Sequence, residues 1–233
     1  MKIRIKFGKY GDMKFIGHLD VMRYFQKVMR RAEVDICYTA GFSPHQVMSF
    51  AAPLGVGLTS DGEYLDIEVN SAGSSEEMVR RMNQAGAEEI PVKSFRQLPD
   101  DAKNAMSLVA AADYLVSFRP GHEPEIRDFG KALEEFFAQE QIIILKKTKK
   151  SETEQDIRPM IYRLEPRQEG IFMQVATGSA ANLKPELVME AFYRFLGLEA
   201  GQFDWMVHRL EVYADTGEEQ RKLVALEDLG HEL

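Results

Sequence analysis

The chain has 233 residues, of which 45% are hydrophobic and 28% charged, the balance of a soluble protein with one large or two small domains. No apolar run reaches the roughly 18 residues that cross a bilayer, and the basic N-terminus lacks the apolar segment of a secretion signal. The single cysteine, Cys37, excludes an internal disulfide and a cysteine-built metal site. We therefore expect a cytoplasmic protein.

Charge is unevenly distributed along the chain. The formal net charge is −8, yet residues 1–50 hold nine Lys and Arg against four Asp and Glu, so the remainder carries the acidic excess. Such a basic segment can bind an anionic partner, or it can be an ordinary solvated surface.

Strand and helix patterns alternate through the first hundred residues. Residues 1–7, "MKIRIKF", alternate basic and apolar side chains with the period of a strand that has one solvated face. The "SSEEMVRRMNQAG" segment opens with a serine cap and closes at Gly86, as a helix does. Strands are predicted over residues 1–7, 36–40, 46–59, 64–69 and 90–98, and helices over 18–33 and 74–86.

The same order of elements recurs in the second half. Arg167 to Gly170 form a predicted hairpin turn between two strands. Strands are predicted over residues 112–118, 142–148, 158–177 and 203–214, and helices over 124–139 and 184–197.

The order β-α-β-β-α-β is that of the ferredoxin-like fold, so the predicted class is α+β with two tandem ferredoxin-like units and antiparallel sheets. The N-terminal domain, residues 1–100, carries the "HLD" and "GFSPH" motifs. The C-terminal domain covers residues 111–233, with a linker near residues 101–110.

The first predicted helix has a basic face and an apolar face. At about 100° per residue, four cations fall within roughly a third of a turn. A row of cations along a helix suits a phosphate backbone, although a solvated helix also favours Lys and Arg. The cations are Arg23, Lys27, Arg30 and Arg31, and the opposite side carries Val21, Met22, Phe25, Val28, Met29 and Ala32.

Two histidines belong to the N-terminal domain, His18 before the helix and His45 in "GFSPH". If both rings reach one phosphate, one can take the 2′-hydroxyl proton of RNA while the other protonates the leaving oxygen. Alternatively, His18 caps or packs against the helix. His18, Asp20 and His45 do not define a coordination geometry, so no metal site is predicted.

The segment "KFGKYGDMKFIGHLDVMRYFQKVMRRAEVDICYTAGFSPHQVMSFAAPLGVGLTSDGEYLDIEV" resembles the signature block of an uncharacterised bacterial family of radical-SAM-associated proteins. "DIRPMIYRL" at residues 156–164 and "NLKPELVMEAF" at residues 182–192 are also similar to it. Members are encoded beside a radical SAM enzyme or fused to it, so the resemblance implies such an enzyme as the partner. The motif residues are His18, Asp20, Gly41, Phe42, Pro44, His45, Pro53, Gly57, Asp156, Arg158, Pro159 and Asn182.

Gly41, Phe42, Pro44 and His45 are expected to form a rigid turn beside the basic helix face. An exposed Phe42 ring can stack on an unpaired base, whereas a buried one would only pack the turn.

We expect a non-catalytic accessory or substrate-binding protein that works with a radical SAM enzyme and binds RNA, without contact to a membrane. The iron–sulfur cluster and S-adenosylmethionine are expected only in the partner, because one cysteine cannot hold a cluster. One alternative is a metal-independent endoribonuclease that uses His18 and His45, and another is a protein-interaction module. The predicted RNA-binding residues are Lys14, Arg23, Lys27, Arg30, Arg31, Phe42 and His45.

Overall fold

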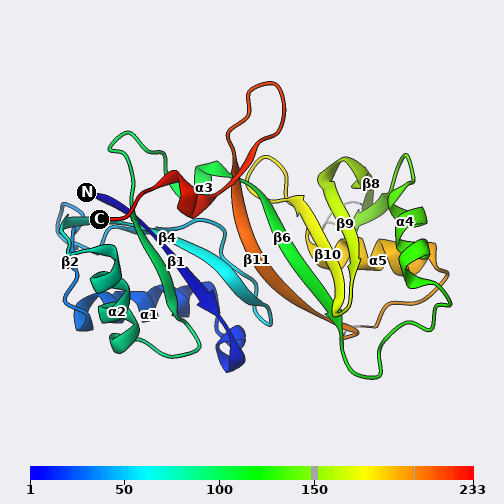
Figure 1. Ribbon diagram of the computed structural model, residues 1–233, viewed down its shortest axis with the longest axis horizontal. Helices are drawn as coiled ribbons and strands as arrows, with labels where there is room; N and C mark the ends of the chain where they lie inside the picture. The colour runs from blue at the N-terminus through cyan, green and yellow to red at the C-terminus, as the bar shows by residue number, and fades with distance from the viewer. Residues whose placement is uncertain (148–151, 202) are drawn as a thin grey trace. The chain divides into compact units, whose positions relative to one another are not determined.

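The structure is a computed structural model that describes residues 1–147, 152–201 and 203–233 (Figure 1). Both halves of the chain mix helices with antiparallel strands, so the predicted α+β class is confirmed. No helix among the described residues is both long and apolar enough to span a membrane.

The chain folds into two compact units. The first holds residues 1–110 together with residues 209–233, and the second holds residues 111–208. The sequence assigned residues 209–233 to the C-terminal domain, whereas in the structure they pack with the N-terminal residues. Part of the expected linker is the short helix α3 (Ala105–Leu108), whose first residue, Ala105, is buried.

Strand β1 (Lys2–Lys9) is central in the first unit, and it pairs antiparallel with β4 (Thr59–Ser71) and β5 (Val92–Gln97). Two short strands, β2 (Asp35–Ile36) and β3 (Met48–Phe50), also pair antiparallel with β4.

The strand predicted over residues 46–59 is interrupted. Only Met48–Phe50 and the start of β4 are extended strand, and residues 51–58 form a loop with a turn at residues 56–57. Pro53 has no backbone N–H to donate to a strand ladder, and Gly57 has a φ of +91°, which residues with a Cβ rarely adopt.

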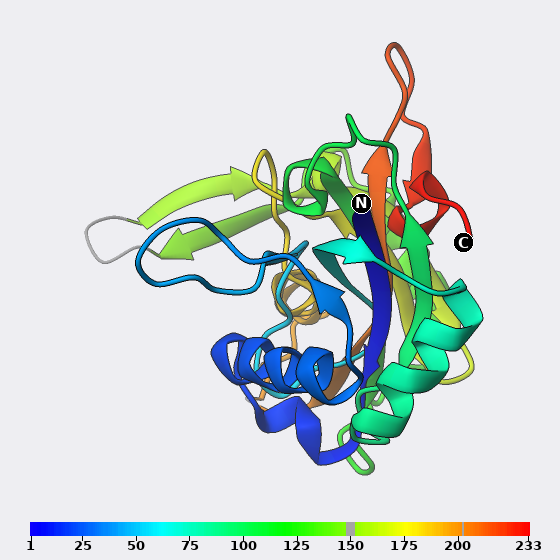
Figure 2. The same ribbon diagram turned by 90° about the vertical axis from the view of Figure 1, so that its left-hand side faces the viewer.

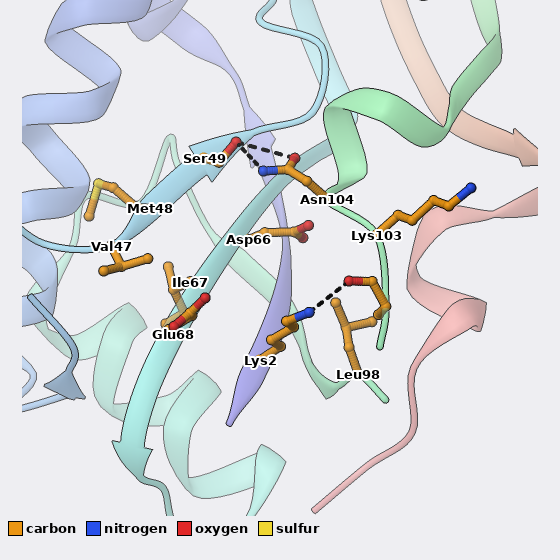
Figure 3. Close-up of a pocket in the computed structure, with 11 residues that line it drawn as sticks. Lys2, Val47, Met48, Ser49, Asp66, Ile67, Glu68, Leu98, Lys103 and Asn104 are labelled. Carbon is orange, nitrogen blue, oxygen red and sulfur yellow. Dashed lines mark hydrogen bonds between the residues drawn. The ribbon is translucent and has the colours of Figure 1, made fainter. Parts of the chain in front are cut away.

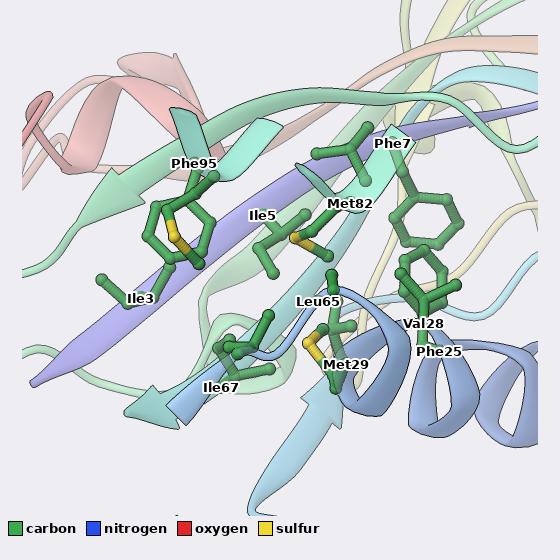
Figure 4. Close-up of a cluster of buried hydrophobic side chains, with 14 of the residues drawn as sticks. Ile3, Ile5, Phe7, Phe25, Val28, Met29, Leu65, Ile67, Met82 and Phe95 are labelled. Carbon is green, nitrogen blue, oxygen red and sulfur yellow. The ribbon is translucent and has the colours of Figure 1, made fainter. Parts of the chain in front are cut away.

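Helices α1 (His18–Arg31) and α2 (Ser75–Ala85) pack on one face of these strands. The Ser74 hydroxyl accepts a hydrogen bond from the Glu77 N–H at 3.3 Å and Gly86 follows the last turn, so the predicted ends of α2 are confirmed. Figure 4 shows the core between the layers, where the apolar side chains of β1 meet those of α1. The residues labelled there are Ile3, Ile5, Phe7, Phe25, Val28, Met29, Leu65, Ile67, Met82 and Phe95.

The opposite face of β1 was predicted to be solvated, and this prediction is wrong for Arg4. The Arg4 side chain is only 1% exposed, because residues 209–233 fold over it. Its guanidinium donates to both carboxylate oxygens of Asp66, at 2.8 and 2.9 Å, and to the Leu226 carbonyl at 3.1 Å. The alternating pattern thus marks a strand with one apolar face and one face of buried ion pairs.

Lys6 lies on the same face of β1 as Arg4. Its ammonium donates to Glu211 and Glu227, each at 2.6 Å, and Tyr64 donates to Glu211 at 2.6 Å. Burial disfavours the charged forms of Lys6 and Glu227, but the hydrogen bonds that these groups make outweigh this effect. The pKa of Lys6 therefore lies above its ordinary value, and the pKa of Glu227 lies below its ordinary value. The contacts join β1 to β11 (Trp205–Asp215) and to the short helix η3 (Leu226–Leu229).

In the second unit, β10 (Gly170–Ala176) lies between β6 (Val109–Phe118) and β9 (Ile161–Arg167). The predicted hairpin turn is confirmed, since Arg167 pairs with Gly170. Strands β7 (Ile143–Lys147) and β8 (Glu152–Asp156) form a separate ladder, and residue 148 of the predicted strand lies outside the described residues. The helices are α4 (Phe129–Phe137) and α5 (Pro185–Phe195), with the short helix η2 (Arg158–Met160).

We predict that Glu227→Gln lowers the free energy of unfolding at neutral pH by about 1–2 kcal/mol, because it removes a charge-assisted hydrogen bond. A carboxylate whose folded pKa is lowered stabilises the fold at neutral pH, and this contribution is lost as the pH falls through the folded pKa. The variant should therefore lose less stability on acidification. Urea unfolding from neutral pH to below 4.5, the ordinary glutamate pKa, measures this difference.

Glu88→Gln, at an exposed residue, is the matched control for this charge change. If Glu227→Gln and the wild type lose stability in parallel on acidification, the stabilising role of the Glu227 carboxylate is wrong.

Candidate nucleic-acid interface

Helix α1 has the two faces that its sequence predicts. Val21, Phe25, Val28 and Met29 are buried against the core, and Met22 packs at its edge. The four cations of the opposite face are all exposed; we call this set, Arg23, Lys27, Arg30 and Arg31, the basic face.

One cation of the basic face has a carboxylate nearby. Arg23 lies 3.4 Å from Asp20, and both side chains are exposed, so this contact is weak. Within residues 1–147, 152–201 and 203–233, Lys27, Arg30 and Arg31 are in no ion pair of 4 Å or less. Their charge is therefore available to an anionic partner.

Residues 38–45 form a loop, here called the GFSPH loop, that projects from the first unit. Tyr38 pairs with Gln46 at its base, and Thr39 and His45 are joined by a backbone hydrogen bond of 2.9 Å. Gly41 has a φ of +112°, which only glycine adopts without strain, so the motif glycine builds the turn. The ring of Phe42 is fully exposed and that of Tyr38 is largely exposed.

The GFSPH loop borders the basic face. The Gln46 side-chain amide donates to the backbone carbonyl of Gln26, in the middle of α1, at 3.4 Å. Figure 2 shows the loop, in blue at the left, on the same side of β1 as α1. On a helical wheel Gln26 lies next to Arg23 and Arg30, so the base of the loop lies next to cations of the basic face.

Lys14 lies before α1, in the short helix η1 (Gly11–Phe15). It is half-buried, and its ammonium lies 5.1 Å from the ring centroid of the exposed Phe15. The Lys14 carbonyl accepts a hydrogen bond from the Gly57 N–H at 2.7 Å, which ties two segments of the family motif together.

His18 and His45 have different surroundings. The half-buried His18 ring packs edge-on against Phe50, with 5.0 Å between ring centroids. The exposed His45 ring contacts the Thr39 hydroxyl at 3.2 Å in the GFSPH loop. His45 and Phe50 are five residues apart along an extended segment, a separation of roughly 16 Å. This arrangement does not favour two rings acting on one phosphate.

A buried charge cluster, which sequence patterns do not indicate, lies beside His18. Lys9, Glu63 and Arg209 are each 2–4% exposed. Lys9 and Glu63 line a small cavity with His18, Pro53 and other residues.

The members of this cluster fix two backbone segments. Arg209 donates to Glu63 and to the Ala52 carbonyl, and Lys9 donates to the Ile16 carbonyl at 3.1 Å. Burial lowers the pKa of Lys9. The bonds hold the turn before Pro53 and the chain that enters α1, so the cluster positions the motif residues His18 and Pro53.

Motif residues of the second unit build local turns. Asp156 accepts hydrogen bonds from the backbone N–H groups of Ile142 and Arg158, both at 2.9 Å. The Arg158 guanidinium lies over the Phe137 ring at 4.0 Å and donates to the Phe137 carbonyl at 2.8 Å. Pro159 lies within η2, and Asn182 is exposed. The described residues contain no group of three or more His, Cys, Asp or Glu that could hold a metal ion.

We predict that Arg209→Met lowers the free energy of unfolding by about 3–5 kcal/mol, because it leaves the Glu63 carboxylate buried without the cation that donates to it. Adding both Glu63→Leu and Lys9→Met should recover much of this loss, since apolar side chains then replace the whole charge cluster. Urea unfolding of the single and triple variants measures both effects. A triple variant as unstable as Arg209→Met alone would show that the cost does not come from the orphaned carboxylate.

A family described as uncharacterized proteins conserved in bacteria (DUF2344) matches residues 2–185, which include the basic face, the GFSPH loop and most of the buried charge cluster. No curated protein matches the chain. Because the match spans well over half of its length, the chain belongs to this bacterial family.

Proposed function

We propose that this protein is a non-catalytic accessory protein that binds single-stranded RNA and works with a radical SAM enzyme. The observation that carries the RNA-binding part is the exposed basic face, together with the exposed Phe42 ring on the GFSPH loop, whose base contacts α1. The proposal that the partner is a radical SAM enzyme rests on the resemblance of the motif block to radical-SAM-associated proteins.

The spacing of the cations supports binding to a sugar–phosphate backbone. Arg23, Lys27 and Arg31 follow each other at intervals of four residues, which is about 6 Å along the helix axis. Each phosphate contact releases condensed counterions, so such a row adds affinity without reading a base sequence. Cations can thus track a strand while the loop contacts its bases.

The GFSPH loop supports a preference for unpaired bases. Phe42 presents an aromatic face that no intramolecular packing covers, and aromatic side chains stack on bases of any identity. Tyr38, at the base of the same loop, is a second exposed aromatic residue. Bases in a duplex are already stacked, so these side chains favour single-stranded RNA.

The proposed role is non-catalytic because His18 and His45 contact different groups. The strand order β5-β1-β4, with β2 and β3 on the far side of β4 and antiparallel pairing throughout, supports a ferredoxin-like arrangement in the first unit. Such a fold hosts many functions, so the surface carries the functional argument.

We predict that Lys27→Gln combined with Arg30→Gln weakens binding to single-stranded RNA and makes it less dependent on salt. Each lost phosphate contact should reduce the slope of log K against log salt by about 0.7, so two lost contacts reduce it by about 1.4. Glutamine preserves the helix, because its helix propensity is close to those of Lys and Arg. Fluorescence anisotropy with mixed cellular RNA fragments across a salt series measures both quantities.

The matched control is Arg80→Gln with Lys103→Gln, which removes two exposed cations outside α1. Equal weakening in both double variants would indicate a general charge effect. No binding of RNA by the wild type at low salt would overturn the RNA-binding proposal and leave docking to a protein partner as the role of this surface.

We predict that Phe42→Ala weakens RNA binding by about tenfold, since stacking on one base contributes about 1–3 kcal/mol. Phe42→Trp should bind at least as well as the wild type, because it retains an aromatic face. Both variants should unfold at the same urea concentration as the wild type, because the ring makes no packing contacts in the core. Unchanged affinity in Phe42→Ala would remove the GFSPH loop from the interface.

A further inference from the structure

A pocket of about 250 Å³ opens on the face of the β1, β3 and β4 strands that lies opposite α1 and α2 (Figure 3). Its floor carries Lys2, Ser49, Asp66 and Glu68, which alternate along the strands with the apolar residues of the core. Residues 98–104 form its wall. The pocket shares no residue with the basic face or the GFSPH loop.

Asp66 is fully engaged within the protein. Arg4 donates to both of its carboxylate oxygens, and the Ala105 N–H donates to one of them at 2.7 Å. The carboxylate and the guanidinium neutralise each other, so Asp66 is a fixed part of the floor that contributes little net charge.

Lys2 and Glu68 are opposite each other in the register of β1 and β4. Side chains of opposite charge in this position normally attract. Instead, the Lys2 ammonium donates to the Ala102 carbonyl at 2.9 Å (Figure 3). In the part of the chain that the structure describes, no side-chain hydrogen bond or ion pair engages the Glu68 carboxylate.

The floor therefore presents two opposite charges that are not committed to each other. An ammonium has three donors, so Lys2 keeps two after its bond to Ala102. Glu68 offers the oxygens of an exposed carboxylate. A ligand with only a positive charge would satisfy Glu68 but would face the like charge of Lys2. A ligand with only a negative charge would satisfy Lys2 but would face the like charge of Glu68.

The remaining walls are neutral and fixed. Asn104 donates to the Ser49 hydroxyl at 2.9 Å, and its side-chain oxygen accepts the Met106 N–H at the start of α3. Val47 and Leu98 supply apolar surface. A hydroxyl–amide pair on one side and aliphatic side chains on the other would suit a small ligand side chain of limited polarity.

We propose that this pocket binds a free α-amino acid, with the ligand's ammonium on Glu68, its carboxylate on Lys2 and its side chain against Val47 and Leu98. The volume of about 250 Å³ lies below the roughly 300–1,000 Å³ of pockets for drug-sized ligands, so it suits a molecule of amino-acid size. Both charges of the ligand meet an opposite charge, which offsets the cost of removing them from water.

The test is isothermal titration calorimetry of the full chain with each of the common amino acids at millimolar concentrations. We expect a subset with small aliphatic side chains to bind. Glu68→Gln and Lys2→Gln should each weaken binding by about tenfold or more, because each removes a charge-assisted hydrogen bond. Lys222→Gln and Glu88→Gln are the controls and should bind as the wild type does, since both residues are exposed and neither lines the pocket.

Modified ligands identify which end of the amino acid meets which residue. The N-acetyl form of the best ligand lacks the ammonium, so it should bind the wild type as weakly as it binds Glu68→Gln. The amide form lacks the carboxylate, so it should bind the wild type as weakly as it binds Lys2→Gln. The proposal is overturned if no amino acid binds the folded wild type, if Glu68→Gln binds as tightly as the wild type, or if the N-acetyl form binds as well as its parent.

Discussion

The ion pairs on one face of β1 are the contacts on which the first unit depends. Arg4 and Lys6 alternate with Ile3, Ile5 and Phe7, so a single strand supplies both an apolar core and a layer of buried charge. The layer is stable because residues from far along the chain provide the counter-charges: Asp66 for Arg4, and Glu211 with Glu227 for Lys6. Residues 209–233 are therefore part of the first unit's structure.

This arrangement places seven of the nine cations of the basic N-terminal segment in two groups. Arg4, Lys6 and Lys9 are held by internal acceptors, whereas the four cations of α1 face solvent. Part of the acidic excess of the later sequence supplies the carboxylates that bind cations of the first group. The charge available to a partner is thus concentrated on α1 and is smaller than a count of Lys and Arg suggests.

The family motif serves two physical purposes. Gly41 and Gly57 adopt backbone conformations that favour glycine, and Asp156 and Arg158 satisfy backbone groups at a turn, so these residues shape the chain. Phe42 makes no comparable contribution to folding, because its ring is in solvent. An exposed aromatic side chain on a loop is better explained by contact with a partner than by stability.

The sequence determined what depends on local periodicity and on turn chemistry. It predicted α1 with its basic and apolar faces, the ends of α2 at Ser74 and Gly86, and the hairpin at Arg167–Gly170, because spacing and capping act over a few residues. Tertiary structure alone decided which polar faces are buried, where residues 209–233 pack and which charges meet at Lys9, Glu63 and Arg209. These outcomes depend on segments about fifty to two hundred residues apart, and such contacts leave no periodic trace in the sequence.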